Sequence, residues 1–201
     1  MGFATRTRRP PRTLSDAETA KILRVTGEHR DGFRDHVILS VALGMALRES
    51  EIVGLDVRDV SNNGRTPKRT IHLRVFKRAG VDIDPSAQRV PVPDGTFYKL
   101  EKYLGLMKLE LEEPLFPSRQ SSRLSARRLR SVFREWQIRA GFSKPYHFHA
   151  LRHTACTNLY RRTRDIHLVA RFARHANIAT TTIYTHVSDE ELREAAKDLA
   201  S

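Results

Sequence analysis

The sequence reads HALRHTACTNLY at residues 149–160 and RHANIATTTIYTH at residues 174–186, and these two stretches carry its strongest signals. His149, Arg152 and His153 are spaced so that a helix would place all three side chains on one face. Residues 149–160 are therefore predicted to be helical, and the apolar residues of segment 166–172 predict a second helix directly after them.

Helical signals continue on both sides of these stretches. Ser15-Asp16-Ala17-Glu18 has the form of a capping box, which predicts that a helix begins at Ser15. Apolar spacing predicts further helices at residues 33–47, 50–54, 95–111, 125–140 and 189–199.

The pattern changes between residues 57 and 93. Apolar residues alternate with their neighbours there, at Ile71, Leu73 and Val75 and again at Val90 and Val92. Two such runs with a long connection predict a small antiparallel sheet. The expected fold class is mainly α with a small antiparallel β-sheet (α+β), in which residues 1–13 form a basic tail or linker.

The charge balance points to a polyanionic partner. The chain has 36 Lys and Arg against 23 Asp and Glu, a formal net charge of +13. Such an excess indicates binding to DNA or RNA ahead of an anionic membrane. Because guanidinium groups suit bidentate phosphate contacts, the cluster before and within segment 125–140 is the predicted DNA-binding set, namely Arg123, Arg127, Arg128 and Arg130.

Other features of composition narrow the setting. Cys156 is the single cysteine, so an internal disulfide is excluded and a reducing compartment is expected. No apolar run is long enough to cross a bilayer, and the start lacks the apolar core of a secretory signal. These features predict a cytoplasmic, DNA-associated protein.

The histidine pair allows two interpretations. His149 and His153 have the spacing of a zinc-binding H-x-x-x-H pair, but Ala150 stands where the metalloprotease motif has glutamate. No cysteine or carboxylate cluster nearby would complete a zinc site. A histidine beside Arg152 is better suited to holding a phosphate, so no metal is expected.

Three sequence boxes together resemble one family. The boxes are LRESEI at residues 47–52, HALRH at residues 149–153 and the segment from His175 to Tyr184. In this order, with Tyr184 nine residues after His175, they resemble the tyrosine recombinases of the phage integrase family. The resemblance runs from Leu14 onward, so residues 14–201 are expected to form the catalytic domain.

The resemblance implies a nucleophile and a phosphate clamp. Tyr184 would attack the scissile phosphorus of double-stranded DNA and form a 3′-phosphotyrosine. Arg48 and Arg152 would bind its non-bridging oxygens, where charge develops in the transition state. Because the ester keeps the bond energy, rejoining would need neither ATP, metal nor another cofactor.

The remaining implied roles concern protons and positioning. His149 would act as acid and base, and His175 would donate a further hydrogen bond to the phosphate. Glu51 would orient the arginine or histidine groups. Lys77 would give a proton to the leaving 5′-oxygen, with Lys68 as the second candidate. The family also implies assembly as a homo-oligomer, a tetramer on two duplexes.

Two departures from the family pattern stand out. Ala173-Arg174 precedes His175 where the family commonly has Leu-Gly. Only the basic tail stands where members usually carry a separate N-terminal helical domain, so the chain is either an isolated catalytic domain or a minimal version.

Two other functions share these features. A type IB topoisomerase-like enzyme would use the same nucleophile and clamp to relax DNA as a monomer. A non-catalytic DNA-binding module would keep the fold but lose Arg48, Arg152 or Tyr184, and all three are present. The helix expected at residues 189–199 is predicted to dock on a neighbouring subunit in the assembled complex, with packing on its own domain as the alternative.

Overall fold

The computed structural model describes residues 11–73, 88–120, 122–175 and 177–184 of the chain. Lys77, the helix expected at residues 189–199 and most of the expected tail lie outside the described residues. None of the helices in the described ranges is long and apolar enough to cross a bilayer.

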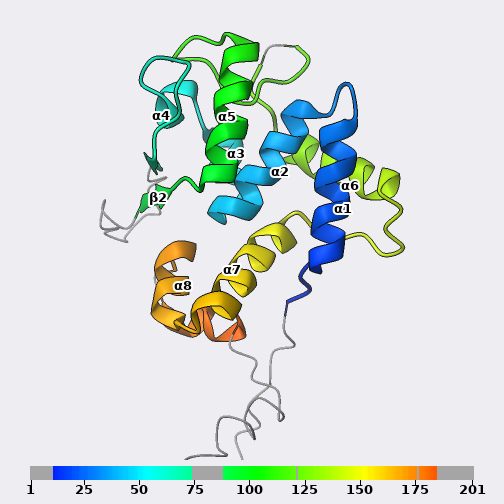
Figure 1. The fold of residues 1–201 in the computed structure, drawn as a ribbon, viewed down its shortest axis with the longest axis vertical. Helices are drawn as coiled ribbons and strands as arrows, with labels where there is room; N and C mark the ends of the chain where they lie inside the picture. Colours follow the sequence, from blue (N-terminus) through cyan, green and yellow to red (C-terminus); the bar gives the residue numbers. More distant parts are fainter. Residues whose placement is uncertain (1–10, 74–87, 121, 176, 185–201) are drawn as a thin grey trace, which may run out of the picture.

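A buried helix, α2 (Phe33–Met45), forms the centre of the fold. All of residues 37–42 are buried, as expected for a helix that is apolar on every side. α1 (Asp16–Glu28), α5 (Asp94–Met107) and α7 (His149–Thr163) pack against it, and Figure 1 shows them arranged around α2.

The predicted helix starts are confirmed where a capping residue marks them. Ser15 caps α1 through a complete capping box with Glu18. Ser125 caps α6 (Ala126–Arg139), whose buried face carries apolar residues at helical spacing: Leu129, Val132, Phe133 and Trp136.

Helix ends differ from the sequence prediction by a few residues. Ala46 ends α2 and Lys108 ends α5, each in the left-handed conformation that turns the chain out of a helix. Arg164 ends α7 in the same way, so the helix extends to Thr163, three residues beyond the expected end. Non-glycine residues adopt this conformation without an obvious sequence signal.

The predicted antiparallel sheet is confirmed. β1 (Thr70–His72) pairs with β2 (Arg89–Pro91), and Ile71 faces Val90 with both side chains buried. One part of the expectation for this region was wrong, because α4 (Val57–Val60) is a short helix. Its start is stabilised by a capping box in which the Asp56 backbone N–H donates to Asp59 Oδ2 at 2.8 Å.

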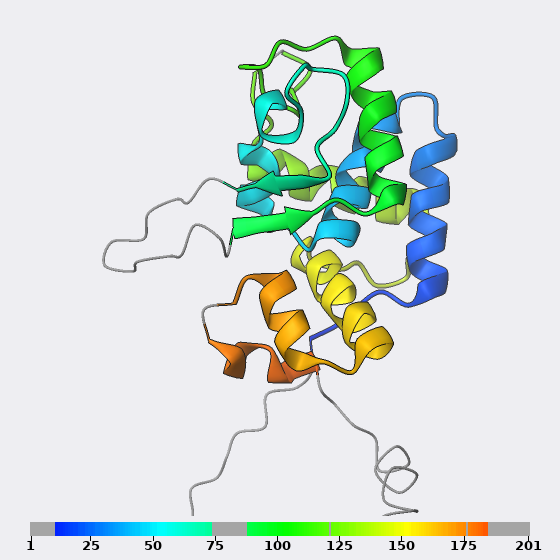
Figure 2. The same ribbon diagram turned by 60° about the vertical axis from the view of Figure 1, so that its left-hand side comes forward.

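A second, smaller unit lies below α2 in Figures 1 and 2. It contains α7, α8 (Ile166–Ala173) and the 3-10 turns η2 (Ile178–Thr180) and η3 (Thr182–Tyr184). Its apolar cluster is separate from the main core and consists of Ala46, Ala155, Cys156, Val169, Ala173 and Tyr184. The end of α2 and the tyrosine segment therefore share one small core.

Candidate active site

Arg48 lies at the start of α3 (Glu49–Gly54), two residues after the turn that ends α2. Its backbone N–H donates to Glu51 Oε2 at 2.6 Å, and its Nη1 donates to Glu51 Oε1 at 2.7 Å. Glu51 thus orients both the main chain and the side chain of Arg48. The Arg48 side chain keeps 41% of its surface exposed, so part of the guanidinium faces solvent.

Arg152 extends from α7 into the space between the ends of two helices. Its Nη1 donates to the carbonyl oxygen of Ala46 at 2.5 Å, and its Nη2 donates to that of Ala173. Burial, with the charges of Arg48 and Arg174, lowers the Arg152 pKa to about 10. The guanidinium is therefore still charged at neutral pH, and the helix ends fix its plane.

Arg174, one of the two departures from the family pattern, lies at the turn that ends α8. It ends α8 with φ 54°, in the left-handed region that glycine adopts most readily. Its side chain is 1% exposed, and its Nη2 donates to Glu51 Oε2 at 2.6 Å. The charge of this arginine is thus buried inside the site and paired with the carboxylate that also holds Arg48.

Glu51 stays ionised in this setting. Burial alone would raise its pKa, but the charge of Arg174, the backbone N–H of Arg48 and the Arg48 charge together lower it. One carboxylate therefore serves two guanidinium groups, and a third, Arg152, has only carbonyl partners among the contacts described.

Tyr184 is buried at the end of η3, with 6% of its surface exposed. Its hydroxyl lies 2.8 Å from Nδ1 of His153, and its ring stacks with that of His175 at 6.4 Å between centroids. Burial and the neighbouring Cys156 thiol raise the pKa of the hydroxyl. The hydroxyl is therefore protonated at neutral pH.

Three histidines lie in this site, and burial lowers the pKa of each. His153 and His175 are lowered to about 4, with further lowering from neighbouring positive groups. His149 is shifted in the same direction by burial, Arg152 and Arg48, and its ring meets that of His153 edge-on at 4.6 Å. All three are consequently neutral at physiological pH and able to accept a proton.

The structure brings most of the expected catalytic set into one place. The electrostatic couplings and contacts described above join Arg48, Glu51, His149, Arg152, His175 and Tyr184. Lys77 lies outside the described residues. His153 was not assigned a catalytic role from sequence. Its spacing from His149 was a usable signal, but that spacing was considered only for zinc.

Metal-binding side chains do not cluster in the described ranges. No group of three or more His, Cys, Asp or Glu residues there is arranged to hold a metal ion. Within the histidine pair, His153 contacts Tyr184, and His149 contacts His153 and lies near the charge of Arg152.

The expected DNA-contact arginines fall into two kinds. Arg123 pairs with buried Asp56, Arg128 pairs with Glu135 at 2.7 Å, and Arg130 pairs with Glu49 at 3.2 Å. Arg127 is exposed on α6 and has no acidic partner among the described residues. Its charge is thus the most available of the four for a phosphate.

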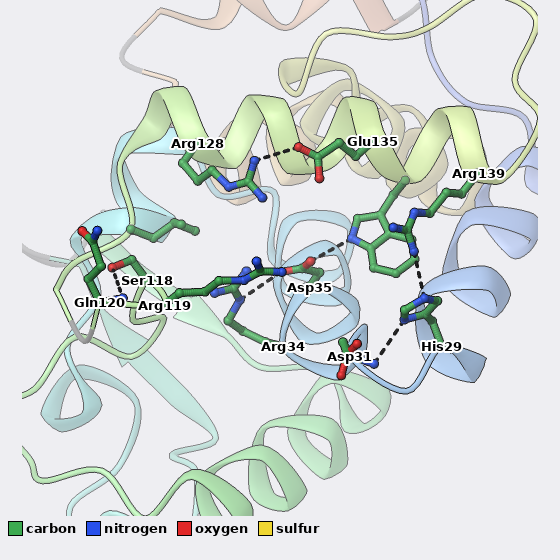
Figure 3. A pocket seen from close by; sticks show the side chains of 12 residues that line it. His29, Asp31, Arg34, Asp35, Ser118, Arg119, Gln120, Arg128, Glu135 and Arg139 are labelled. Carbon is green, nitrogen blue, oxygen red and sulfur yellow. Dashed lines mark hydrogen bonds and ion pairs between the residues drawn. The ribbon is translucent and has the colours of Figure 1, made fainter.

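A pocket lies where α6 passes the start of α2, and Figure 3 shows side chains of both signs around it. Trp136 Nε1 donates to Asp35 Oδ2 at 2.8 Å, and Arg34 binds the same carboxylate. The lining includes Arg128 but no residue of the expected catalytic set. Its charges are largely paired with one another, so it does not form an evident anion site.

Comparison with known proteins agrees with these observations. Tyrosine recombinase XerC of Salmonella typhi is 30% identical over 184 residues, which are 90% of this chain and 58% of XerC. The crystal structure of XerA recombinase is 26% identical with a TM-score of 0.75, covering 96% of this chain and 67% of XerA.

A XerH site-specific recombinase bound to its difH substrate has the same fold, with a TM-score of 0.74 at 22% identity, covering 99% of this chain and 57% of XerH. The chain thus spans little more than half the length of XerC and XerH. The model of the phage integrase family matches residues 12–191. With the three boxes folded into one site, this match shows that the chain belongs to the phage integrase family.

Proposed function

We propose that residues 14–201 are the catalytic domain of a site-specific DNA recombinase or integrase that cleaves and rejoins strands through Tyr184. One observation carries the proposal. The Tyr184 hydroxyl contacts a neutral histidine, His153, and its pKa is influenced by the nearby charge of Arg152, whose guanidinium is fixed by two carbonyls. A phosphoryl transfer without metal requires such a nucleophile, a base and fixed positive charge.

The reaction follows from these groups. The Tyr184 oxygen attacks the scissile phosphorus, the bond from phosphorus to the 5′-oxygen breaks, and a 3′-phosphotyrosine forms. The tyrosine proton passes to a histidine, and the departing 5′-oxygen takes a proton from an acid. One phosphodiester bond is exchanged for another, so the reverse attack by a 5′-hydroxyl rejoins DNA without ATP.

The phosphate would be bound by Arg48 and Arg152. Two N–H groups of Arg152 donate to carbonyl oxygens, which fix the orientation of its guanidinium. The exposed part of the Arg48 side chain lies at the same site. Guanidinium groups held in advance stabilise developing charge without reorganisation. His175 would add a hydrogen bond, since its Nδ1 is engaged with Thr181 Oγ1 at 2.9 Å. That contact leaves Nε2 for the substrate.

The base and the acid are assigned separately. His149 is neutral and adjacent to His153, so the two can accept the tyrosine proton in turn. Lys77 remains the proposed acid. Lys68, the alternative, donates its amine to the Arg58 carbonyl at 2.6 Å, which favours Lys77.

The proposed partner is double-stranded DNA, which the basic face of α6 contacts. The proposed assembly is a homotetramer on two duplexes, located in the cytoplasm. The recombinase XerH, which has the same fold, was solved bound to its difH substrate. If residues 189–199 dock on a neighbouring subunit, truncation after His186 should reduce synapsis of two DNA sites far more than binding of one.

A nicked suicide substrate tests the proposal directly. Cleavage releases a short oligonucleotide and leaves a covalent protein–DNA adduct, visible on a denaturing gel in buffer containing EDTA. The adduct should form with the natural chain and be absent with Tyr184→Phe, which should still bind DNA. An adduct that survives in Tyr184→Phe, or that depends on added metal, contradicts the assignment.

The same preparation separates the alternatives. Relaxation of supercoiled plasmid by a monomer, without recombination of two sites, would indicate a type IB topoisomerase-like enzyme. DNA binding with no adduct on any cleavable substrate would indicate a non-catalytic binding module.

A further inference from the structure

The geometry points to Arg174 as a positioning residue. It controls the position of the Arg48 guanidinium through the carboxylate that both arginines bind, Glu51. This inference rests on the proposed function. Its basis is the departure from the family pattern: a buried arginine occupies the left-handed position directly before His175, where Leu-Gly is common.

Glu51 is divided between two arginines. Its Oε1 accepts from Arg48 Nη1 at 2.7 Å, while its Oε2 accepts from Arg174 Nη2 and from the Arg48 backbone N–H, both at 2.6 Å. A carboxylate presents two oxygens to a guanidinium fork and binds it most strongly when both are free for it. Arg174 occupies one of them, which leaves Arg48 with a single side-chain contact to Glu51.

Arg174 also contacts Arg48 through its main chain. Its carbonyl oxygen accepts from Arg48 Nη2 at 3.4 Å. The turn at the end of α8 is therefore linked to Arg48 in two ways. The carbonyl of Arg174 contacts Arg48 directly, and its side chain is linked to Arg48 through Glu51. His175 follows in the chain, so one residue links the segment that leads to Tyr184 with the arginine at the start of α3.

Burial excludes Arg174 from the substrate. Its side chain is 1% exposed, whereas that of Arg48 is 41% exposed. Nη1 of Arg174 binds the Phe172 carbonyl at 3.1 Å, and Nε has no acceptor among the described residues, so Glu51 is its one anionic partner there. Arg174 thus acts on the reaction only through the groups that it holds.

Loss of Arg174 has a defined consequence. Glu51 would then face Arg48 alone, bind it with both oxygens and offset its charge more completely. Arg48 would be drawn toward α3 and away from the phosphate. The loss should appear in the rate of bond cleavage and not in DNA affinity, because the buried side chain makes no phosphate contact.

Two substitutions remove the charge in different ways. Arg174→Gly suits the left-handed backbone, so it should fold, and Arg174→Met keeps most of the buried volume. Single-turnover cleavage of the suicide substrate should fall about tenfold or more in both, while the dissociation constant for DNA changes less than about twofold. Arg174→Lys, which can still pair with Glu51, should recover most of the rate.

A double-mutant cycle identifies the route of the effect. In a Glu51→Gln background, Arg174→Met should cost less than about threefold, because the carboxylate that it controls has already lost its charge. Equal costs in both backgrounds would overturn the proposal, and so would a wild-type cleavage rate in Arg174→Gly and Arg174→Met.

A readout without catalysis completes the test. A crystal structure of Arg174→Met without DNA should show the Arg48 guanidinium bound by both oxygens of Glu51. An unmoved Arg48 would overturn the positioning role. If Arg48 moves in Arg174→Met but the wild-type chain forms no DNA adduct, the proposed function is refuted. The positioning role of Arg174 then still holds.

Discussion

His153 Nδ1 lies 2.8 Å from the hydroxyl oxygen of Tyr184, while His149 meets His153 edge-on. The histidine that contacts the proposed nucleophile is therefore the one directly after Arg152 in the sequence. Because burial and adjacent positive groups lower the His153 pKa to about 4, its ring is neutral at neutral pH, and in the tautomer protonated on Nε2 its Nδ1 accepts from the hydroxyl. It holds the hydroxyl in place before any DNA arrives.

We expect loss of that acceptor to slow cleavage. His153→Phe keeps a ring but removes the acceptor, so the single-turnover rate should fall about 100-fold or more, the range typical of general acid–base catalysis. In His153→Asn the side-chain oxygen can stand near the place of Nδ1, and this variant should keep most of the rate. Equal rates in the Phe variant and the natural chain would show that the contact has no part in cleavage.

Stability should depend on pH between about 4 and 6.5. His153 and His175 have folded pKa values near 4, while an unfolded histidine has a pKa of about 6.5. Within that window the unfolded chain binds more protons, so the free energy of unfolding falls as pH falls. Urea denaturation at several pH values measures the slope.

The control for this slope is another histidine. Replacing both His153 and His175 by Asn should make the slope shallower and leave the contribution of His149, whereas His167→Asn, at an exposed position of α8, is the control. A slope unaffected by the double replacement would mean that other groups cause it.

Arg152→Lys should reduce both stability and cleavage. A lysine cannot hold two carbonyls with a planar fork, so the Ala46 or Ala173 carbonyl would lose its donor. A buried acceptor without a partner costs roughly 1–3 kcal/mol, which thermal or urea unfolding can detect. Arg171→Lys, at an exposed position on α8, is the matched control and should change neither quantity.

DNA affinity should depend unequally on the arginines of α6. Arg127→Ala should weaken binding and reduce the slope of log affinity against log salt by about 0.9, the value for one phosphate contact. Arg128→Ala should have a smaller effect, because Glu135 already balances its charge at 2.7 Å. Fluorescence anisotropy across a salt series distinguishes the two, and equal slopes in both variants would contradict the difference.

Local signals in the sequence predicted much of the fold. The Ser15 capping box and the apolar alternation around Ile71 and Val90 lie within short segments, and the structure confirms both. The ends of α2 and α5 were not predictable in this way. Ala46 and Lys108 both adopt the left-handed conformation, and no glycine marks either turn in the sequence.

Motif spacing likewise predicted which residues gather at the site but not all of their contacts. Arg48, Arg152 and Tyr184 were identifiable from the three boxes. The pairing of Arg174 with Glu51 joins residues 123 positions apart, and that of His153 with Tyr184 joins residues 31 apart. No periodicity encodes such pairs, since they depend on how α3, α7 and α8 meet.

Arg152 is anchored by the carbonyls of Ala46 and Ala173, and this choice of partner affects how the protein can diverge. Every amino acid supplies a carbonyl, so side chains at these two positions can be exchanged without removing the anchor, provided that they fit the small apolar cluster. Insertion or deletion of a single residue at either helix end would instead move the carbonyl out of reach. The side chains around these helix ends can therefore vary, while the residues at which α2 and α8 end stay constrained.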